Sequence, residues 1–178
     1  MPRTYYDDFP VCATVRDLIL DGFRRGGDKR QFLFRDASGE EREKTFADVR
    51  RDTEALGAYL RTLGVKKGDR IAILSENSYF WNVAYYAGII NGSVVVPLES
   101  GMPAEDVFDQ IRNSGCVAVF YSDAQAEKIG YAKAQPGFGL LHCLPAAKAE
   151  AFYAAGNAAP PELKTAFLEE TAAPEDLA

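Results

Sequence analysis

Two amphipathic helices, each opened by a capping motif, dominate the pattern of the first third of the chain. Residues 14–17 (TVRD) and 45–48 (TFAD) both place an acid three positions after a threonine, a spacing that lets the two side chains cap a helix reciprocally. Apolar residues follow at intervals of three and four, so we expect helices over 15–26 and 46–63. The solvent side of the second helix is expected to carry Arg50, Arg51, Asp52 and Glu54.

A β-hairpin is predicted between these two helices. Residues 31–36 (QFLFRD) alternate between apolar and polar positions, and residues 41–46 (EREKTF) resume a strand-like pattern. The intervening residues 36–39 (DASG) have the composition of a hairpin loop.

Short apolar runs alternate with helical segments in the middle of the chain. The runs at 69–75, 93–98 and 117–121 are typical of parallel strands that are covered on both faces. Helices are predicted between them at 79–90 and 103–113.

The pattern of the last third is weaker. We expect one more strand at 138–143, a helix over 145–156, and a polar connection over 158–177 with one or two helical turns around 162–169. In the helix predicted at 103–113, Pro103 is expected at the first helical position.

The alternation of strands and helices predicts an α/β fold, with a mainly parallel sheet, helices on both faces and a preceding β-hairpin. The chain of 178 residues has the length of one domain. Within it, residues 1–46 are expected to form the N-terminal helix and hairpin, 47–144 the βαβ core, and 145–178 a helical surface connection.

Composition and charge exclude several classes of function. The chain carries 20 Lys and Arg against 26 Asp and Glu, a net charge of −6 that argues against a nucleic-acid partner. No apolar stretch reaches the roughly 18–20 residues of a transmembrane segment. Because the first ten residues lack the apolar core of a secretory signal, we expect a cytoplasmic protein.

Motifs that carry chemistry are scarce. No G-x-G-x-x-G, Walker A loop or G-x-S-x-G occurs, so the sequence predicts neither a phosphate cradle nor a hydrolase nucleophile. The single histidine, His142, lies in an apolar run and is expected to be structural rather than a catalytic base. The number and spacing of Cys12, Cys116 and Cys143 suit neither a disulfide framework nor a zinc site. Because Cys116 and Cys143 lie beside apolar runs, we expect these two to be buried, unreactive thiols.

Two loops at the carboxyl ends of predicted strands carry acids. Glu76 and Asn77 follow the first parallel strand and Glu99 follows the second, at the edge where α/β sheets bind ligands. Helix capping is the favoured interpretation of both loops: Asn77 or Ser78 can cap the helix at 79–90, and Ser100 or Met102 precedes the helix at 103–113.

The helix predicted at 79–90 is unusually aromatic. Its rings could line an apolar ligand tunnel, but the favoured interpretation is the central packed helix of an α/β layer. On that interpretation Trp81 is buried against the sheet. The aromatic residues are Tyr79, Phe80, Trp81, Tyr85 and Tyr86.

Four segments, in a fixed order, point to a family: Thr45-Phe46-x-Asp48-Val49, residues 64–72 (GVKKGDRIA), residues 90–98 (INGSVVVPL) and Asn113-Ser114-Gly115. With them, residues 14–122 resemble the N-terminal part of adenylate-forming enzymes, which include acyl-CoA synthetases, luciferases and peptide-synthetase adenylation domains. Glu76-Asn77-x-x-x-Trp81 is most similar to the long-chain fatty acyl-CoA synthetase branch.

The resemblance implies the N-terminal subdomain of the acyl-CoA synthetase-like fold. Such enzymes activate a carboxylic acid with Mg-ATP to an acyl-adenylate and then pass the acyl group to CoA. In the family, the phosphate loop, the ATP-binding residues and the catalytic lysine all lie later in the chain. Residues 174–178 resemble the stretch just before the strand that leads into that loop.

We therefore expect an N-terminal fragment that is inactive alone and carries no catalytic, cofactor-binding or metal-binding residue. Mg, ATP and CoA would serve the full-length enzyme, with none bound to this fragment. Its expected partners are the rest of its own chain, namely the ATP-binding body and the C-terminal domain, and a fatty acid substrate in the full-length enzyme.

Departures from the family pattern leave alternatives open. Asn91 replaces the usual Ala before Gly92, and Glu99 and Gly101 stand where some members carry a small polar residue or a basic residue near CoA, so contact of this loop with CoA is doubtful. The chain could belong to an aryl-CoA ligase or a peptide-synthetase adenylation domain. It could also be a stand-alone, non-catalytic α/β binding module, which the length of the reading frame would decide.

Overall fold

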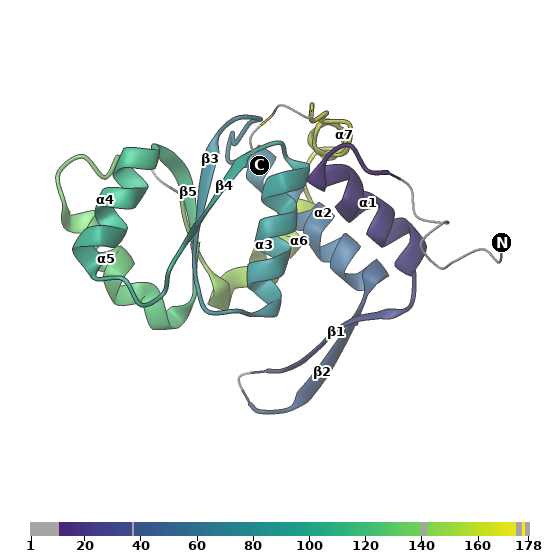
Figure 1. Ribbon diagram of the computed structural model, residues 1–178, viewed down its shortest axis with the longest axis horizontal. Coiled ribbons are helices and arrows are strands. Elements are labelled where there is room, and N and C mark those ends of the chain that lie inside the picture. Colours follow the sequence, from purple (N-terminus) through teal and green to yellow (C-terminus); the bar gives the residue numbers. More distant parts are fainter. Residues whose placement is uncertain (1–10, 37, 140–141, 174–175, 177–178) are drawn as a thin grey trace.

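The computed structural model describes residues 11–36, 38–139, 142–173 and 176. They form a two-stranded antiparallel sheet and a four-stranded parallel sheet, surrounded by helices (Figure 1). In chain order the elements are α1 (Val15–Gly26), β1 (Arg30–Arg35), β2 (Glu41–Thr45), α2 (Phe46–Thr62), β3 (Arg70–Leu74), α3 (Tyr79–Ile90), β4 (Val94–Leu98), α4 (Ala104–Ser114), β5 (Cys116–Tyr121), α5 (Ala126–Ala134), β6 (His142–Pro145), α6 (Ala149–Asn157) and α7 (Pro161–Leu168). Short 3-10 turns lie at Asp123–Gln125 and Ala146–Lys148.

The parallel sheet has the strand order β4-β3-β5-β6, and helices cover both of its faces. Side chains alternate between the faces along β3: Ile71 and Ile73 pack with α2, α3 and α6, whereas Ala72 and Leu74 pack with α4 and α5. Figure 1 shows α4 and α5 on one side of the sheet and the other helices on the opposite side. The predicted α/β fold is therefore confirmed.

Both predicted capping motifs form. Thr14 Oγ1 accepts a hydrogen bond from the backbone N–H of Asp17 at 3.1 Å, and the Asp17 carboxylate accepts from Thr14 N–H at 3.2 Å. Thr45 and Asp48 repeat the arrangement at 3.1 and 3.0 Å. Each motif satisfies N-terminal amides that the helix leaves without internal partners.

One position on α2 contradicts the expected solvent face. Asp52 is only 6% exposed, although we expected it on the solvent side of the helix. Asp52 comes three residues after Val49 and four residues before Leu56, so it lies on the same face of the helix as this apolar stripe. There the hairpin and α3 cover it, and polar side chains neutralise it.

The elements after β4 differ from the expected ones in detail. Pro103 has a non-helical ψ of 154° and stands at the N-cap, so α4 begins at Ala104 rather than at the proline. The last strand lies at His142–Pro145, not at 138–143, and residues 140–141 lie outside the described residues. Helix α5 was not expected; its inward face is narrow, with Ile129 and Ala132 as its buried residues.

The C-terminal part of the chain crosses back over the end of α2 and the loop that precedes β3. Arg61 and Glu170 form an ion pair at 2.9 Å, and Lys67 Nζ lies 2.9 Å from both the Thr171 carbonyl and the Asp176 carboxylate. Across the described ranges, no helix combines the length and the hydropathy that a membrane span requires.

Candidate functional site

The parallel strands β3, β4 and β5 end at the same edge of the sheet, which is the usual ligand-binding edge of an α/β fold. Three loops meet there. The loop after β3 carries Glu76, the loop after β4 carries Glu99 and Ser100, and the loop after β5 carries Ser122 and Gln125.

Glu76 is the acid at this edge whose carboxylate is held by hydrogen bonds from other side chains. Ser122 Oγ donates a hydrogen bond to one carboxylate oxygen at 2.6 Å, and Gln125 Nε2 donates to the other at 2.5 Å. The hydrogen bond from Ser122 has the larger effect and the bond from Gln125 the next; both hold the pKa of the Glu76 carboxyl below its usual range. Glu76 is therefore an ionised carboxylate at neutral pH, exposed to solvent and fixed across two loops.

The other expected residues of this edge are separate from Glu76. Glu99 and Asn77 are exposed, and within the described chain neither is a hydrogen-bond partner of the Glu76 carboxylate. Ser78 rather than Asn77 caps α3, because its Oγ accepts from Trp81 N–H at 3.1 Å. The capping interpretation is thus confirmed for the β3–α3 loop. It is wrong for the loop after β4, because neither Ser100 nor Met102 caps α4, whose N-cap is Pro103 with no side-chain hydrogen bond.

Lys128 adds a positive charge to the same edge. Lys128 Nζ donates to the Ser100 carbonyl and ties α5 to the loop after β4. Its charge also favours the ionised form of Glu76, after the hydrogen bonds from Ser122 and Gln125. Sequence reasoning found Glu76 but not Ser122, Gln125 or Lys128, because only the pairing of β3 with β5 brings these loops together.

This arrangement can hold a polar group but offers no catalytic pair. Among the described residues, no group of three or more His, Cys, Asp and Glu could hold a metal ion. His142 lies half-buried on β6. Cys116 and Cys143 are half-buried rather than fully buried, and burial raises the pKa of both thiols, which disfavours the reactive thiolate.

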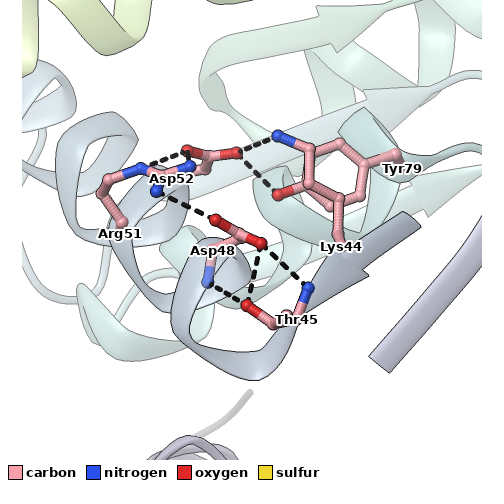
Figure 2. Close-up of polar contacts among 6 residues, drawn as sticks. All are labelled: Lys44, Thr45, Asp48, Arg51, Asp52 and Tyr79. Carbon is pink, nitrogen blue, oxygen red and sulfur yellow. Dashed lines mark hydrogen bonds and ion pairs between the residues drawn. The ribbon is translucent and has the colours of Figure 1, made fainter. Parts of the chain in front are cut away.

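A second polar cluster, the Asp52 network, lies between the hairpin and the helices. Figure 2 shows its members: Lys44, Thr45, Asp48, Arg51, Asp52 and Tyr79. Asp52 accepts from Lys44 Nζ at 3.0 Å and from the Tyr79 hydroxyl at 2.7 Å, while Arg51 donates from the other side at 3.2 Å. Lys44 Nζ also lies 4.9 Å from the centroid of the Tyr79 ring.

Burial shapes the titration of this network. Burial, followed by the hydrogen bond to Asp52, raises the pKa of Tyr79 far above its usual range. Tyr153 of α6 is affected similarly, by burial first and then by the charge of Asp52, and its hydroxyl has no hydrogen-bond partner among the described groups. Both phenols stay neutral, so the network fastens β2, α2 and α3 together rather than transferring protons.

The aromatic residues of α3 divide between core and surface. Phe80 is buried and meets Phe120 edge-on at 5.6 Å. Trp81, expected to be largely buried, is half-buried and stacks on Tyr85 at 5.4 Å between ring centroids. Tyr85 and Tyr86 line an open apolar groove beside α1.

Comparison with known proteins places these features in context. Residues 22–178 match the family model described as AMP-binding enzyme. The chain is 28% identical over 105 residues to the acyl-CoA ligase YtcI of Bacillus subtilis and 31% identical over 91 residues to the long-chain-fatty-acid–CoA ligase FadD13 of Mycobacterium tuberculosis. These alignments cover 58% and 51% of this chain but 20% and 18% of the two relatives, so the chain matches about a fifth of their length.

A solved structure shows the same fold. The inhibitor-bound crystal structure of the N-terminal domain of FACL13 from Mycobacterium tuberculosis aligns with a TM-score of 0.70 at 20% identity. The alignment covers 92% of this chain and 37% of that domain.

Proposed function

Because the chain belongs to the AMP-binding enzyme family, we propose that it is the N-terminal part of an AMP-forming fatty acyl-CoA ligase. The observation that carries the proposal is the family match over residues 22–178. The similarity to FadD13, which is named as a long-chain-fatty-acid–CoA ligase, supports the choice of substrate class.

The proposed reaction has two steps. A fatty acid carboxylate attacks the α-phosphorus of ATP, so that an acyl-adenylate forms and pyrophosphate leaves. The thiol of CoA then attacks the acyl carbon, the acyl group is transferred to sulfur, and AMP leaves. In the second step the thiol proton is lost to solvent or to a base.

This chain's residues do not fit Mg-ATP by themselves. The Glu76 carboxylate at the sheet edge already accepts hydrogen bonds from Ser122 and Gln125. The described residues contain no cluster of three or more His, Cys, Asp and Glu that could hold a metal ion. The sequence contains no glycine-rich phosphate cradle. In the proposed enzyme these residues therefore carry out no adenylation step; the chain provides a scaffold and part of the substrate wall.

The proposal implies partners that lie outside this chain. The ATP-binding body and the C-terminal domain of the enzyme would bring the residues for ATP, Mg and CoA, and the fatty acid would bind between them and this lobe. We also place the enzyme in the cytoplasm. The division into residues 1–46, 47–144 and 145–178 remains our interpretation of one domain.

The proposal is tested with the protein encoded by the complete reading frame that contains these 178 residues. This protein is assayed for pyrophosphate release with Mg-ATP and, in turn, palmitate, benzoate and the amino acids, with and without CoA. Fatty-acid-dependent pyrophosphate release and acyl-CoA formation are expected. A preference for benzoate or for an amino acid would support an aryl-CoA ligase or a peptide-synthetase adenylation domain instead. A reading frame that ends after Ala178, with no pyrophosphate release, would indicate a stand-alone binding module.

A further inference from the structure

An apolar groove lies on the surface between α1, β1 and α3. We call it the α1–α3 groove; its volume is about 330 Å³, and Leu18, Ile19, Phe23, Tyr85 and Tyr86 are among the residues that line it. Figure 1 shows α1 and α3 on the side of the parallel sheet away from α4 and α5. Leu18 is 60% exposed and Val15, at one end of the groove, is 42% exposed.

Helix α1 buries little of its apolar side. Phe23 is the one buried residue of the helix and meets the Tyr86 ring edge-on at 5.8 Å. Leu18 nevertheless points its side chain toward solvent next to two tyrosine rings. Exposed apolar side chains that adjoin an apolar groove are a feature of surfaces that contact another body.

The groove offers little to a small carboxylic acid. No Lys or Arg is among the described residues that line it, and Arg16, next to Val15 in the chain, donates to the backbone carbonyls of Ile90 at 3.3 Å and Leu168 at 2.7 Å. Its one polar amide, Gln31, donates to the Tyr86 hydroxyl at 3.4 Å. A fatty acid here would leave its carboxylate without a strong charged partner.

The C-terminal segment lies beside the same groove. Ala172, Ala173 and Asp176 form a cavity together with Val15, and Val15 also lines the α1–α3 groove. The contacts of Lys67 with Thr171 and Asp176, both at 2.9 Å, hold this segment in place. A lobe attached beyond Ala173 would therefore start near Val15, at one end of the groove.

We propose that the α1–α3 groove is the surface on which the ATP-binding body of the enzyme docks onto this lobe. The inference rests on the proposed function, which requires such a body. The aligned FACL13 N-terminal domain supports it, because 37% of that domain corresponds to this chain and the rest is further polypeptide. Docking of an apolar face would remove Leu18 from water.

The test compares one substitution in two contexts. Leu18→Glu and the control Tyr131→Glu are made in the 178-residue chain and in the product of the complete reading frame. Tyr131 is 37% exposed and lies on α5, on the opposite face of the sheet. Leu18→Ser, a milder change, is made in parallel. Thermal unfolding, hydrogen exchange of residues 15–26 and sedimentation are measured for every variant.

We expect Leu18→Glu to leave the Tm of the 178-residue chain within about 2 °C of the parent and to lower the Tm of the longer protein by about 4 °C or more. Hydrogen exchange of residues 15–26 should be slower in the longer protein, and Leu18→Glu should abolish that difference. Leu18→Ser should produce the same changes to a smaller extent, and Tyr131→Glu should produce neither.

Other outcomes would overturn the inference. Equal effects of Leu18→Glu in the two contexts, or a reading frame that ends after Ala178, would exclude a docked body at this groove. A 178-residue chain that sediments as a dimer and becomes a monomer with Leu18→Glu would assign the groove to a second copy. A longer protein that is destabilised as expected but adenylates no carboxylic acid would retain the docking surface and reject the proposed function.

Discussion

Asp52 illustrates how a single buried carboxylate fixes the relative positions of several elements. It joins Lys44 of β2, Arg51 of α2 and Tyr79 of α3, and the pairing partners compensate for the cost of removing its charge from water. The sequence placed it on the solvent side because a charged residue among arginines is usually exposed. Its spacing from Val49 and Leu56 indicates the buried face of the helix, but Asp52 is buried only because the hairpin covers that face.

The first prediction concerns this network. Asp52→Asn leaves Lys44 without its carboxylate partner and removes one of the two carboxylates that pair with Arg51, the other being Asp48. It should lower the free energy of unfolding by about 1.5–3 kcal/mol, as measured by urea denaturation at pH 7. Asp109→Asn is the control, because Asp109 pairs with Arg112 on the exposed surface of α4. The control should change stability by less than about 0.5 kcal/mol. Equal losses for both variants would contradict the importance of the network.

The second prediction concerns the contact between α2 and α6. A Cβ atom at Gly156 would lie 1.8 Å from the carbonyl oxygen of Ala55, and backbone cannot move aside cheaply. Gly156→Ala should therefore cost about 3 kcal/mol. At Gly130, on α5, a Cβ atom meets nothing within 4 Å, so Gly130→Ala should gain about 0.5–1 kcal/mol through helix propensity. A neutral Gly156→Ala in denaturant titrations would show that the helices do not pack this closely.

The third prediction concerns Glu76 and pH. Its pKa is lowered in the folded state, so its hydrogen bonds add stability above the unfolded pKa of about 4.3, and that contribution is lost as the pH falls through the folded pKa. Ser122→Ala should raise the pKa of Glu76, as followed by carboxyl ¹³C NMR. The stability difference from the parent chain should be present at pH 7 and shrink below about pH 4.

Ser114→Ala is the matched control for Glu76, because Ser114 Oγ donates to the backbone carbonyl of Gln110 rather than to a carboxylate. Its effect on stability should not change over the same acid range. A Ser122→Ala difference that is equally independent of pH would contradict the assigned hydrogen bond.

At the scale of elements, local signals set most of what the sequence could predict. The capping motifs at Thr14 and Thr45 and the 3,4 spacing behind them place α1 and α2 within a residue or two. Helix α5 was missed because an alanine-rich segment with two buried residues has no distinct apolar stripe. The shift of β6 to His142–Pro145 reflects its pairing with β5, which a sequence pattern does not contain.

The fourth prediction tests the junction between hairpin and helix. Thr45 ends β2 and caps α2, so Thr45→Ala removes the hydroxyl that accepts from Asp48 N–H and donates to its carboxylate. A loss of about 1 kcal/mol is expected. Thr45→Ser keeps the hydroxyl and should retain most of that stability in the same urea titration. A Thr45→Ser loss as large as that of Thr45→Ala would show that the methyl group, not the cap, is the important part.

At the scale of the whole molecule, the sequence predicted the fold class, whereas the candidate site was predicted only in part. Glu76 was placed at the correct edge of the sheet, but its partners Ser122 and Gln125 come from a loop 46 and 49 residues later in the chain. Side chains that meet only through strand order leave no periodic signal. The same holds for the α1–α3 groove, since exposure depends on what the rest of the molecule covers.

The central claim is that this lobe contributes structure rather than adenylation chemistry. Phosphoryl and adenylyl transfer require positioned amides, cations and a metal around the phosphates. The net charge of −6 also opposes a polyanionic ligand at low salt.

Titration calorimetry of the purified 178-residue chain with Mg-ATP, run beside a pyrophosphate-release assay with palmitate, tests this claim most directly. We predict no measurable turnover and no ATP binding tighter than the millimolar range, which corresponds to about −4 kcal/mol. Micromolar affinity for ATP, or palmitate-dependent release of pyrophosphate that Glu76→Gln abolishes, would contradict it and make the edge around Glu76 an active site.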